Sequence, residues 1–496
     1  MSFFWSQRLG ASASPDLMYY YSELMKEPEF LRAVHDYDRA QLVMLSRAGL
    51  APKSTIQGMA RALRQMEEEG VVEARTRLSN VIHGGEEFLR QVCGPESAGL
   101  LHLGRSSPSI RAVASRLLVR RRLLGVLVEL VEVRRAVFVL AADHLETYMP
   151  GYSYLQHIDL TTLGYYLLSW GAALERDTQR LVESYQVVNV SVVGSDGGFG
   201  TPYQVALEQL DELLGFPRPC LNARDGIRNY DYLIQSLAGL AILDTTLARL
   251  GTDLLVWSTS EFGFVRIPSQ FSITSSVAPH MRIPYVLEFL CGLAAIGAGG
   301  LMEGLSAVKA PSEQLEAATL LPLQVLRQTD EAHRALKVLA EVMGHLEVDG
   351  ARLRRAAESS SAIVGGVLAW LIGECGVPYR DAHRAVAEFQ RKREDQGRFR
   401  QPLDAQDIAD LSARLRPLLH CDNGSVVATL EARTRVPAVV ASHSLRGGTS
   451  AARAKEQLAV ARSALERDSA LVNAALADDE QAAAHLATGL AQLAAD

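Results

Sequence analysis

The chain contains few cysteines for its length, five in 496 residues, and no two of them show C-x-x-C spacing. They are Cys93, Cys220, Cys291, Cys375 and Cys421. Clustered cysteines mark disulfide frameworks and structural zinc sites, so we expect neither here. This usage fits a reducing compartment, and we expect the protein to be cytoplasmic.

The sequence also lacks a strong excess of charge of one sign. The formal net charge is −7, and Lys and Arg do not gather into one basic tract. Nucleic acids and anionic membrane surfaces attract proteins through such tracts. We therefore expect neither as a partner.

No uncharged apolar run reaches the roughly 18 to 20 residues of a membrane-spanning helix. The longest ones cover residues 289–302 and 359–373, and Arg8 interrupts the N-terminal apolar residues, which makes them a poor secretory signal. Both runs predict buried core helices and no membrane span. A helix that is apolar on all sides must be covered on all sides, which an oligomeric bundle achieves more readily than one chain.

Strand patterns are scarce, and internal repeats at solenoid periods are absent from the sequence. With 48% hydrophobic and 22% charged residues the chain is globular, and its length would allow about three domains. Residues 187–193 and 264–267 are the two strand candidates. Helical periodicity dominates elsewhere, and it predicts long helices over residues 110–145, 159–186, 229–261, 284–305 and 311–346, with a further helix or two after residue 450.

One stretch carries most of the functional information: Thr274-Ser-Ser-Val-Ala-Pro-His-Met-Arg-Ile-Pro284, followed by Glu288. It resembles the mobile catalytic loop of the fumarase/argininosuccinate lyase superfamily, G-S-S-x-M-P-x-K-x-N-P with an acidic residue four positions later. The serines, the prolines and Glu288 are in register. Met281 stands where the family has lysine, and Ile283 stands where it has asparagine.

Further matches follow in the order of the family, and they are most similar to argininosuccinate lyase. They are Phe4-Trp-Ser-Gln-Arg8, Leu101-His-Leu-Gly-Arg-Ser-Ser-Pro-Ser109, Pro150-Gly-Tyr-Ser-Tyr-Leu-Gln156, Glu261-Phe-Gly-Phe-Val265 and Leu445-Arg-Gly-Gly-Thr449. The resemblance covers roughly residues 1–465. It implies a mostly α-helical, three-domain subunit of the fumarase/aspartase type, whose long central helices form a 20-helix core in a homotetramer.

The resemblance also implies how the chain is divided and where its site forms. We expect an N-terminal helical domain over residues 1–109, a central long-helix bundle over 110–355 and a C-terminal helical domain over 356–465. An Ala-rich helical extension would follow over 466–496. In the family, the loops near residues 101–109, 150–160 and 270–285 come together from different subunits around a small-molecule substrate.

The resemblance assigns roles to the loop around Ser275. Ser275 is placed as the base that removes a proton beside a carboxylate, next to Ser276. Serine is a weak base and needs strong electrostatic support, part of which is lost with the lysine and the asparagine. Arg282 or His280 could replace the cation that Met281 lacks, although neighbouring side chains point in different directions.

The second loop places Tyr154 where the family's histidine pairs with the loop glutamate, here Glu288. A tyrosine keeps a hydrogen-bonding hydroxyl but does not exchange protons near neutral pH as histidine does. Ser153 replaces threonine and Gln156 is kept, so the shape of the loop should survive. His157 could stand in for the histidine, or it could be structural.

The third loop keeps His102, Arg105 and Ser106, which the resemblance places at the substrate. Arg105 is either a ligand or a structural guanidinium. Residues 107–109 replace R-N-D, and residues 312–315 and 320–324 replace another polar part of the family's site. The substitutions run from charge to neutrality, which favours a less charged substrate over random decay.

Two hypotheses remain. The first is a lyase of bacterial specialised metabolism, which eliminates or adds across a C–N or C–O bond. The second is a catalytically silent scaffold or ligand-binding protein. We expect no cofactor, because the glycines of residues 194–200 lack the flanking strand and acidic residue of a dinucleotide site. We expect no metal either, since His83, Glu86 and Glu87 have no second ligand cluster near them in the sequence.

Overall fold

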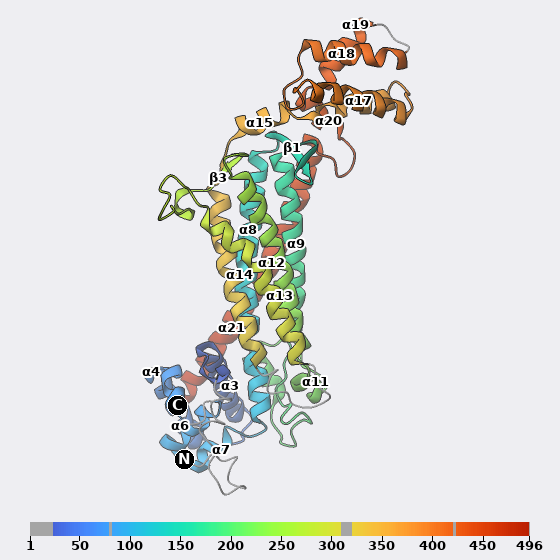
Figure 1. Cartoon of the computed structure of the whole chain (residues 1–496). Coiled ribbons are helices and arrows are strands. Elements are labelled where there is room, and N and C mark those ends of the chain that lie inside the picture. The colour runs from blue at the N-terminus through green and yellow to red at the C-terminus, as the bar shows by residue number, and fades with distance from the viewer. Residues whose placement is uncertain (1–22, 79–81, 309–319, 420–422, 496) are drawn as a thin grey trace.

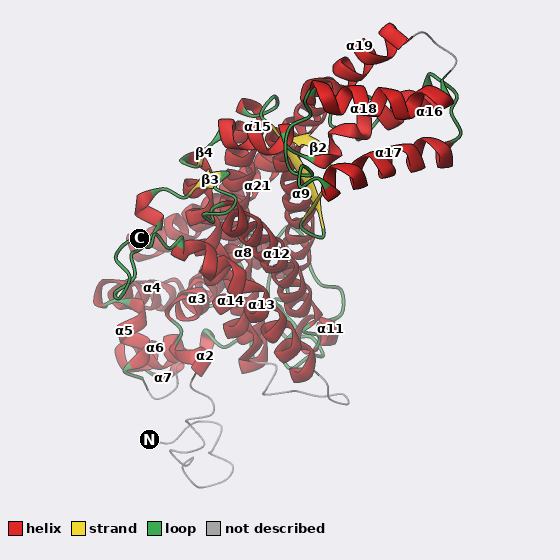
Figure 2. Ribbon diagram, turned by 45° about the horizontal axis from the view of Figure 1, so that its top comes forward, coloured by secondary structure: helices red, strands yellow, loops and turns green. Residues whose placement is uncertain are grey.

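We describe the protein from a computed structural model, which covers residues 23–78, 82–308, 320–419 and 423–495. Three features of the sequence lie outside the described residues: the motif from Phe4 to Arg8, the segment of residues 312–315, and Cys421. The described chain is mostly helical, as we predicted (Figures 1 and 2).

Five long helices form a bundle that sets the long axis of the molecule (Figure 1). They are α8 (Ser107–Asp143), α9 (Leu163–Val188), α12 (Asp231–Trp257), α13 (Tyr285–Ala307) and α14 (Leu321–Gly344). Their leucine and valine side chains share one buried apolar core. The helical periodicity of the sequence predicted each of them, although the first part of the predicted helix over residues 311–346 lies outside the described residues.

Helix α8 begins where the sequence places its capping residues. Ser106 is the N-cap, and its hydroxyl accepts a hydrogen bond from the backbone N–H of Ser109 while the Ser109 hydroxyl accepts one from the N–H of Ser106. Pro108 occupies the first turn, where its missing N–H costs nothing. The start of this helix fixes the position of the 101–109 loop.

Two short antiparallel sheets lie at the opposite end of the bundle. Strand β1 (Tyr148–Ser153) pairs with β2 (Gln156–Thr162) in a hairpin, and β3 (Val265–Arg266) pairs with β4 (Glu347–Val348). The prediction of a strand near residue 265 is thus confirmed, and the hairpin was missed. The predicted strand at 187–193 is wrong, because its first valines end α9 and Val188 is fully buried in the bundle core.

A second apolar core lies around the N-terminal helices at one end of the bundle. These helices are α2 (Glu23–Lys26), α3 (Pro28–Arg47), α4 (Lys53–Glu69), α5 (Val71–Thr76), α6 (Gly84–Cys93) and α7 (Pro95–Leu100). The first turns of α8 join this core, as do α10 (Leu207–Leu213) and α11 (Ala223–Arg228). The boundary that we expect near residue 109 lies in this region and stays a prediction.

A third apolar core lies in the C-terminal helices at the other end. They are α15 (Gly350–Glu358), α16 (Gly365–Gly373), α17 (Tyr379–Asp395), α18 (Ala405–Leu415), α19 (Asn423–Arg433) and α20 (Val436–Ser442). Short 3-10 turns occur at η2 (Ser269–Phe271), η4 (Ser361–Val364) and η5 (Arg416–Leu418). The apolar run 359–373 is therefore a short turn followed by a short helix.

The last helix, α21 (Ala451–Ala495), returns along the whole bundle to the N-terminal helices (Figure 1). It packs on α8, α9, α3 and α4. The helix is continuous through residue 465, so the extension that we expect to start at residue 466 continues a helix that begins earlier.

Helix α13 is the most apolar helix of the bundle and the most exposed. By length and composition α12 and α13 could each cross a membrane, which the lengths of the uncharged runs did not indicate. Of the most apolar 18-residue stretch of each helix, 61% is buried inside the protein in α12 but only 28% in α13. The prediction of a buried helix over residues 289–302 is therefore wrong for one chain, where Ile296 is 46% and Met302 63% exposed.

Candidate functional site

The predicted site residues fall into two groups at opposite ends of the bundle. His102, Arg105 and Ser106 directly precede α8, whereas Ser153 and Tyr154 follow its other end. The 37 residues of α8 make it about 55 Å long at 1.5 Å per residue. One chain therefore does not bring the three predicted loops together (Figure 1).

The loop of residues 268–284 projects from the β3 end of the bundle (Figure 1). Its base is closed by an antiparallel bridge in which Ile273 and Ile283 exchange two backbone hydrogen bonds of 2.9 and 2.8 Å. Inside the loop, the hydroxyl oxygen of Ser275 accepts hydrogen bonds from the N–H groups of Val277 (3.3 Å) and Ala278 (3.1 Å). Ser276 is exposed beside it.

The other loop residues face a cavity of about 960 Å³ between the loop, β3 and α15. His280, Met281 and Arg282 line it, together with Arg266 and Arg352. The guanidinium of Arg282 donates a hydrogen bond to the backbone carbonyl of Ile267, which fixes it at the base of the loop. Met281 is 45% exposed and presents a thioether to this cavity.

Tyr154 lies at the tip of the hairpin and is 98% exposed. Ser153 pairs with Gln156, so Tyr154 and Leu155 form a two-residue turn with φ values of 54° and 56°. Such turns favour Asn-Gly, because bulky residues are strained at positive φ. Glu288, in the first turn of α13, makes no hydrogen bond or ion pair with Tyr154 within the described part of the chain.

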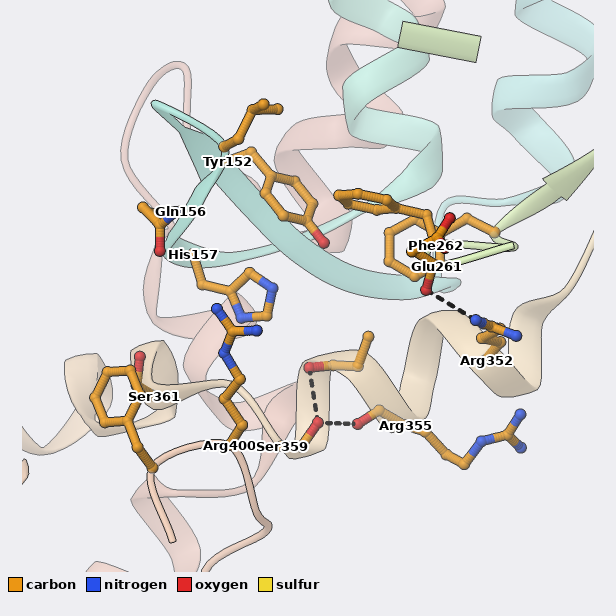
Figure 3. Close-up of a pocket in the computed structure, with 14 residues that line it drawn as sticks. Tyr152, Gln156, His157, Glu261, Phe262, Arg352, Arg355, Ser359, Ser361 and Arg400 are labelled. Carbon is orange, nitrogen blue, oxygen red and sulfur yellow. Dashed lines mark hydrogen bonds between the residues drawn. The ribbon is translucent and has the colours of Figure 1, made fainter. Parts of the chain in front are cut away.

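A second cavity, of about 550 Å³, lies beneath the hairpin (Figure 3). Four segments line it: the hairpin, residues 261–264, the stretch from α15 to η4, and the loop after α17. The lining includes Gln156, which we predicted, and Tyr152, Phe262, Arg355 and Arg400, which we did not. Some of the residues that we missed come from regions without a recognised motif. The others belong to a motif, but its spacing does not show where their side chains point.

His157 and Tyr152 form one wall of this cavity (Figure 3). Nδ1 of His157 lies 3.1 Å from the Ser360 hydroxyl, and its ring meets that of Tyr152 edge-on at 5.1 Å. Burial and then the charge of Arg400 lower the pKa of His157, so its imidazole is neutral at physiological pH. Burial raises the pKa of Tyr152 to about 12, which keeps its hydroxyl protonated.

At the other end of the bundle, Arg105 is buried and lies 2.8 Å from Asp38. Its guanidinium also stacks 4.9 Å above the ring of Tyr37. Burial alone would raise the pKa of Asp38, but Arg75 and Arg105 outweigh it and lower the pKa. We considered Arg105 either as a substrate ligand or as a structural guanidinium, and these contacts favour the structural role. Ser106 is likewise engaged, because its hydroxyl donates to the carbonyl of Asp196 over 2.7 Å.

His102 joins a group of residues that could hold a metal. One ligand atom each of His83, Glu86 and His102 lies within 4.8 Å of the others. Burial, and then the charges of His102 and Arg105, lower the pKa of His83 to about 3. Burial disfavours any charge at this position, and Arg105 adds a positive charge nearby, so the surroundings that disfavour a proton on His83 also disfavour a metal cation. The absence of a metal therefore stays our prediction, although the sequence did not show that His102 joins this group.

Comparison with known proteins identifies relatives along most of the chain. A sequence profile of the family described as "Lyase" matches residues 53–299. An argininosuccinate lyase of Methanoculleus marisnigri is 30% identical over 472 residues, which cover 93% of each chain. An argininosuccinate lyase of Methanocorpusculum labreanum is 30% identical over 76% of this chain and 78% of its own.

Solved structures show the same fold. A variant of EDDS lyase with bound fumarate superposes with a TM-score of 0.83 over 98% of this chain and 97% of its own, at 21% identity. The 3-carboxy-cis,cis-muconate lactonizing enzyme of Pseudomonas putida superposes with a TM-score of 0.69 over 94% of this chain and 100% of its own, at 20% identity. The identity to the lyase of Methanoculleus marisnigri over nearly the whole chain, together with this common fold, places the protein in the argininosuccinate lyase/fumarase superfamily.

Proposed function

We propose that the protein is a lyase of bacterial specialised metabolism, which breaks or forms a C–N or C–O bond beside a carboxylate. Its substrate would be a small molecule less charged than argininosuccinate. Membership of the superfamily supports the reaction class, and the loop around Ser275 supports the site.

The observation that carries the proposal is the pair of backbone N–H groups that point at the Ser275 hydroxyl oxygen. Hydrogen bonds to the charged form of a group stabilise that form, so the two donors favour a serine that has given up its proton. In the elimination, this oxygen takes a proton from the carbon beside the carboxylate. The electron pair of the broken C–H bond forms the C=C bond, and the nitrogen or oxygen leaves with the pair of the bond that breaks.

The leaving atom must also receive a proton, and Tyr154 is the candidate donor. Its exposed position at the hairpin tip makes its hydroxyl accessible to a group on another subunit. A tyrosine hydroxyl can donate a proton or orient the substrate. Glu288 would act from the first turn of α13, and Ser276, Ser153, Gln156 and His102 would bind substrate.

The side chains at the loop support a less charged substrate. Met281 contributes an apolar surface to the loop cavity, and Arg282 is held by the Ile267 carbonyl and does not replace the missing lysine in this arrangement. A pocket with fewer cations stabilises a dianionic intermediate less well. A substrate with fewer carboxylates would not need that cation.

The site requires assembly, and we propose the homotetramer of the family. The predicted loops lie at both ends of a helix about 55 Å long, so one chain cannot complete the site. The exposed apolar face of α13 is the surface that other copies would cover. We propose that the tetramer is cytoplasmic and binds no membrane.

The alternative is a silent scaffold or ligand-binding protein. Arg105, Ser106 and Arg282 each use their polar groups in contacts within the chain, which favours this alternative. The two hypotheses differ in whether Ser275 is needed for product formation.

The test uses a host strain that lacks the gene, complemented with the wild-type chain, with Ser275→Ala or with Thr274→Ala. Thr274 is the matched control, because it is exposed and directly precedes Ser275. Mass spectrometry of the metabolites should show a product with wild type and with Thr274→Ala but not with Ser275→Ala. Product formation by all three proteins would contradict the serine-base mechanism.

A further inference from the structure

The cavity beneath the hairpin carries an excess of positive charge. Three arginines line it, Arg352, Arg355 and Arg400, against one carboxylate, Glu261. Arg352 is occupied, because one nitrogen of its guanidinium donates to the backbone carbonyls of Ser260 and Glu261 at 2.8 Å each. Within the described part of the chain, Arg355 and Arg400 have no hydrogen bond or ion pair through their side chains.

Arg400 is the cation whose guanidinium lies beside His157 in this cavity. In Figure 3 its guanidinium rises from the loop after α17 toward the ring of His157, whereas Arg355 extends outward at the rim. A guanidinium has five N–H donors arranged to meet a carboxylate through two parallel hydrogen bonds. Its neighbour His157 is neutral, so it adds a hydrogen-bonding group without a second charge.

The loop that carries Arg400 is braced on both sides. The buried Arg393 of α17 donates a hydrogen bond to the carbonyl of Gln401 over 2.7 Å and lies 3.3 Å from Asp407. Arg398 lies 2.9 Å from the same carboxylate. These contacts hold the backbone before and after Arg400, and a cation on a fixed loop loses less entropy when a ligand binds.

Aromatic rings form the wall opposite the loop. The ring of Tyr152 lies 5.8 Å from that of Phe262 and 6.5 Å from that of Phe264, and Phe262 and Phe264 meet at a right angle. The Tyr152 hydroxyl is directed into the cavity (Figure 3). An apolar wall with a few convergent polar groups is typical of small-molecule sites.

We propose that this cavity binds a small organic anion: its carboxylate meets Arg400, and its flat apolar part lies against Tyr152 and Phe262. The cavity volume of about 550 Å³ is in the range of small-molecule sites. The ligand would join the hairpin of the bundle to the C-terminal helices, because its two ends would contact different parts of the fold.

This site is separate from the Ser275 loop. The two cavities have only Arg352 in common among their lining residues, and residues 268–284 do not line the cavity beneath the hairpin. The proposal therefore does not depend on Ser275, and Gln156 is the one residue assigned to the lyase site that also lines this cavity. Binding to this cavity should survive in the Ser275→Ala protein.

The test is isothermal titration of the full-length protein with benzoate, benzamide and acetate at constant ionic strength. We expect saturable binding of benzoate, and at least tenfold weaker binding of benzamide, which lacks the charge, and of acetate, which lacks the ring. Arg400→Gln should weaken benzoate binding at least tenfold. Arg391→Gln should not, because Arg391 is an exposed arginine of α17 that does not line the cavity.

Arg400→Lys serves as the second variant, and circular dichroism checks that each protein is folded. Lysine keeps the charge without the fork of donors, so benzoate should bind more weakly than to wild type and more tightly than to Arg400→Gln. The proposal is overturned if wild type does not bind benzoate saturably, if benzamide or acetate binds as tightly, or if Arg400→Gln binds unchanged. Loss of benzoate binding in a folded Ser275→Ala protein would overturn the separation of the two sites.

Discussion

Arg134 in the second half of α8 is fully buried, and its guanidinium donates a hydrogen bond of 2.5 Å to Asp468 of α21. A second nitrogen lies 3.9 Å from Glu175, and the Thr178 hydroxyl accepts from the first over 3.1 Å. Arg120, nearer the start of α8, makes a similar ion pair with α21, because its guanidinium lies 2.6 Å from Asp479. The C-terminal helix therefore supplies the counter-charges for cations inside the bundle.

The first prediction concerns Asp468. Asp468→Asn should lower the free energy of unfolding by about 3 kcal/mol, because it removes the nearest anion from a buried guanidinium. Chemical denaturation measures this change. Glu466→Gln, at an exposed position of the same helix, should stay within about 0.5 kcal/mol of wild type. Equal stabilities of the two variants would show that α21 is not held by this pair.

The second prediction concerns the pH dependence of stability. Burial, with a contribution from Glu331, raises the pKa of Asp244 in α12 to about 7. Its Oδ1 is buried and has no hydrogen bond within the described part of the chain, and its Oδ2 would lie 2.6 Å from a Cβ added to Gly297. The folded state thus prefers the protonated carboxyl.

Since the unfolded state loses this proton at a lower pH, the contribution of Asp244 is full below about pH 4 and is lost as the pH rises to about 7. Wild type should therefore lose up to about 4 kcal/mol between pH 4 and pH 8 through this group. Asp244→Asn should remove that loss, and Asp231→Asn, at the exposed start of the same helix, should retain it. Denaturation curves at the two pH values measure the loss in the free energy of unfolding. An equal loss in all three proteins would contradict the assignment to Asp244.

The third prediction concerns the turn of the hairpin. Replacing Tyr154 by Asn and Leu155 by Gly relieves two positive φ angles, so the double variant should be more stable by about 1 kcal/mol. Tyr154→Phe keeps the strain and should leave stability unchanged. Denaturation measures both. An unchanged or lower stability of the double variant would show that the turn is not strained.

The fourth prediction concerns the reaction of the related lyases. Cleavage of argininosuccinate should be absent or several orders of magnitude slower than in an argininosuccinate lyase, because Met281, Ile283 and Tyr154 replace its charged and polar groups. Met281→Lys alone should not restore it. An ordinary rate of fumarate release by the wild-type protein would contradict the proposed change of substrate.

Much of the fold could be predicted from the sequence. The 3.6-residue period of the apolar side chains marked the long helices, and Ser106 with Pro108 marked the start of α8. The hairpin could not be predicted, since Pro150 and Gly151 interrupt any alternation and the turn residues are Tyr154 and Leu155. The exposure of α13 was missed because periodicity does not tell which apolar face another chain covers.

The site was harder to predict than the fold. The resemblance located the loop of Ser275, but the engagement of Arg282 by the Ile267 carbonyl and of Arg105 by Asp38 depends on tertiary contacts. Arg400 and His157 line the same cavity, although 243 positions separate them in the sequence. No local pattern around Arg400 indicates this neighbour.

The central claim is that the site forms between the opposite ends of different chains. The most direct test is double electron–electron resonance between spin labels at Leu103→Cys and Ser276→Cys, with each label on a separate chain and the native cysteines replaced. We predict a distance well below the roughly 55 Å that α8 imposes within one chain. Ile296→Glu, which places a charge on the exposed apolar face of α13, should abolish the short distance. If the spin-labelled protein that keeps Ile296 shows no short distance, the claim is contradicted.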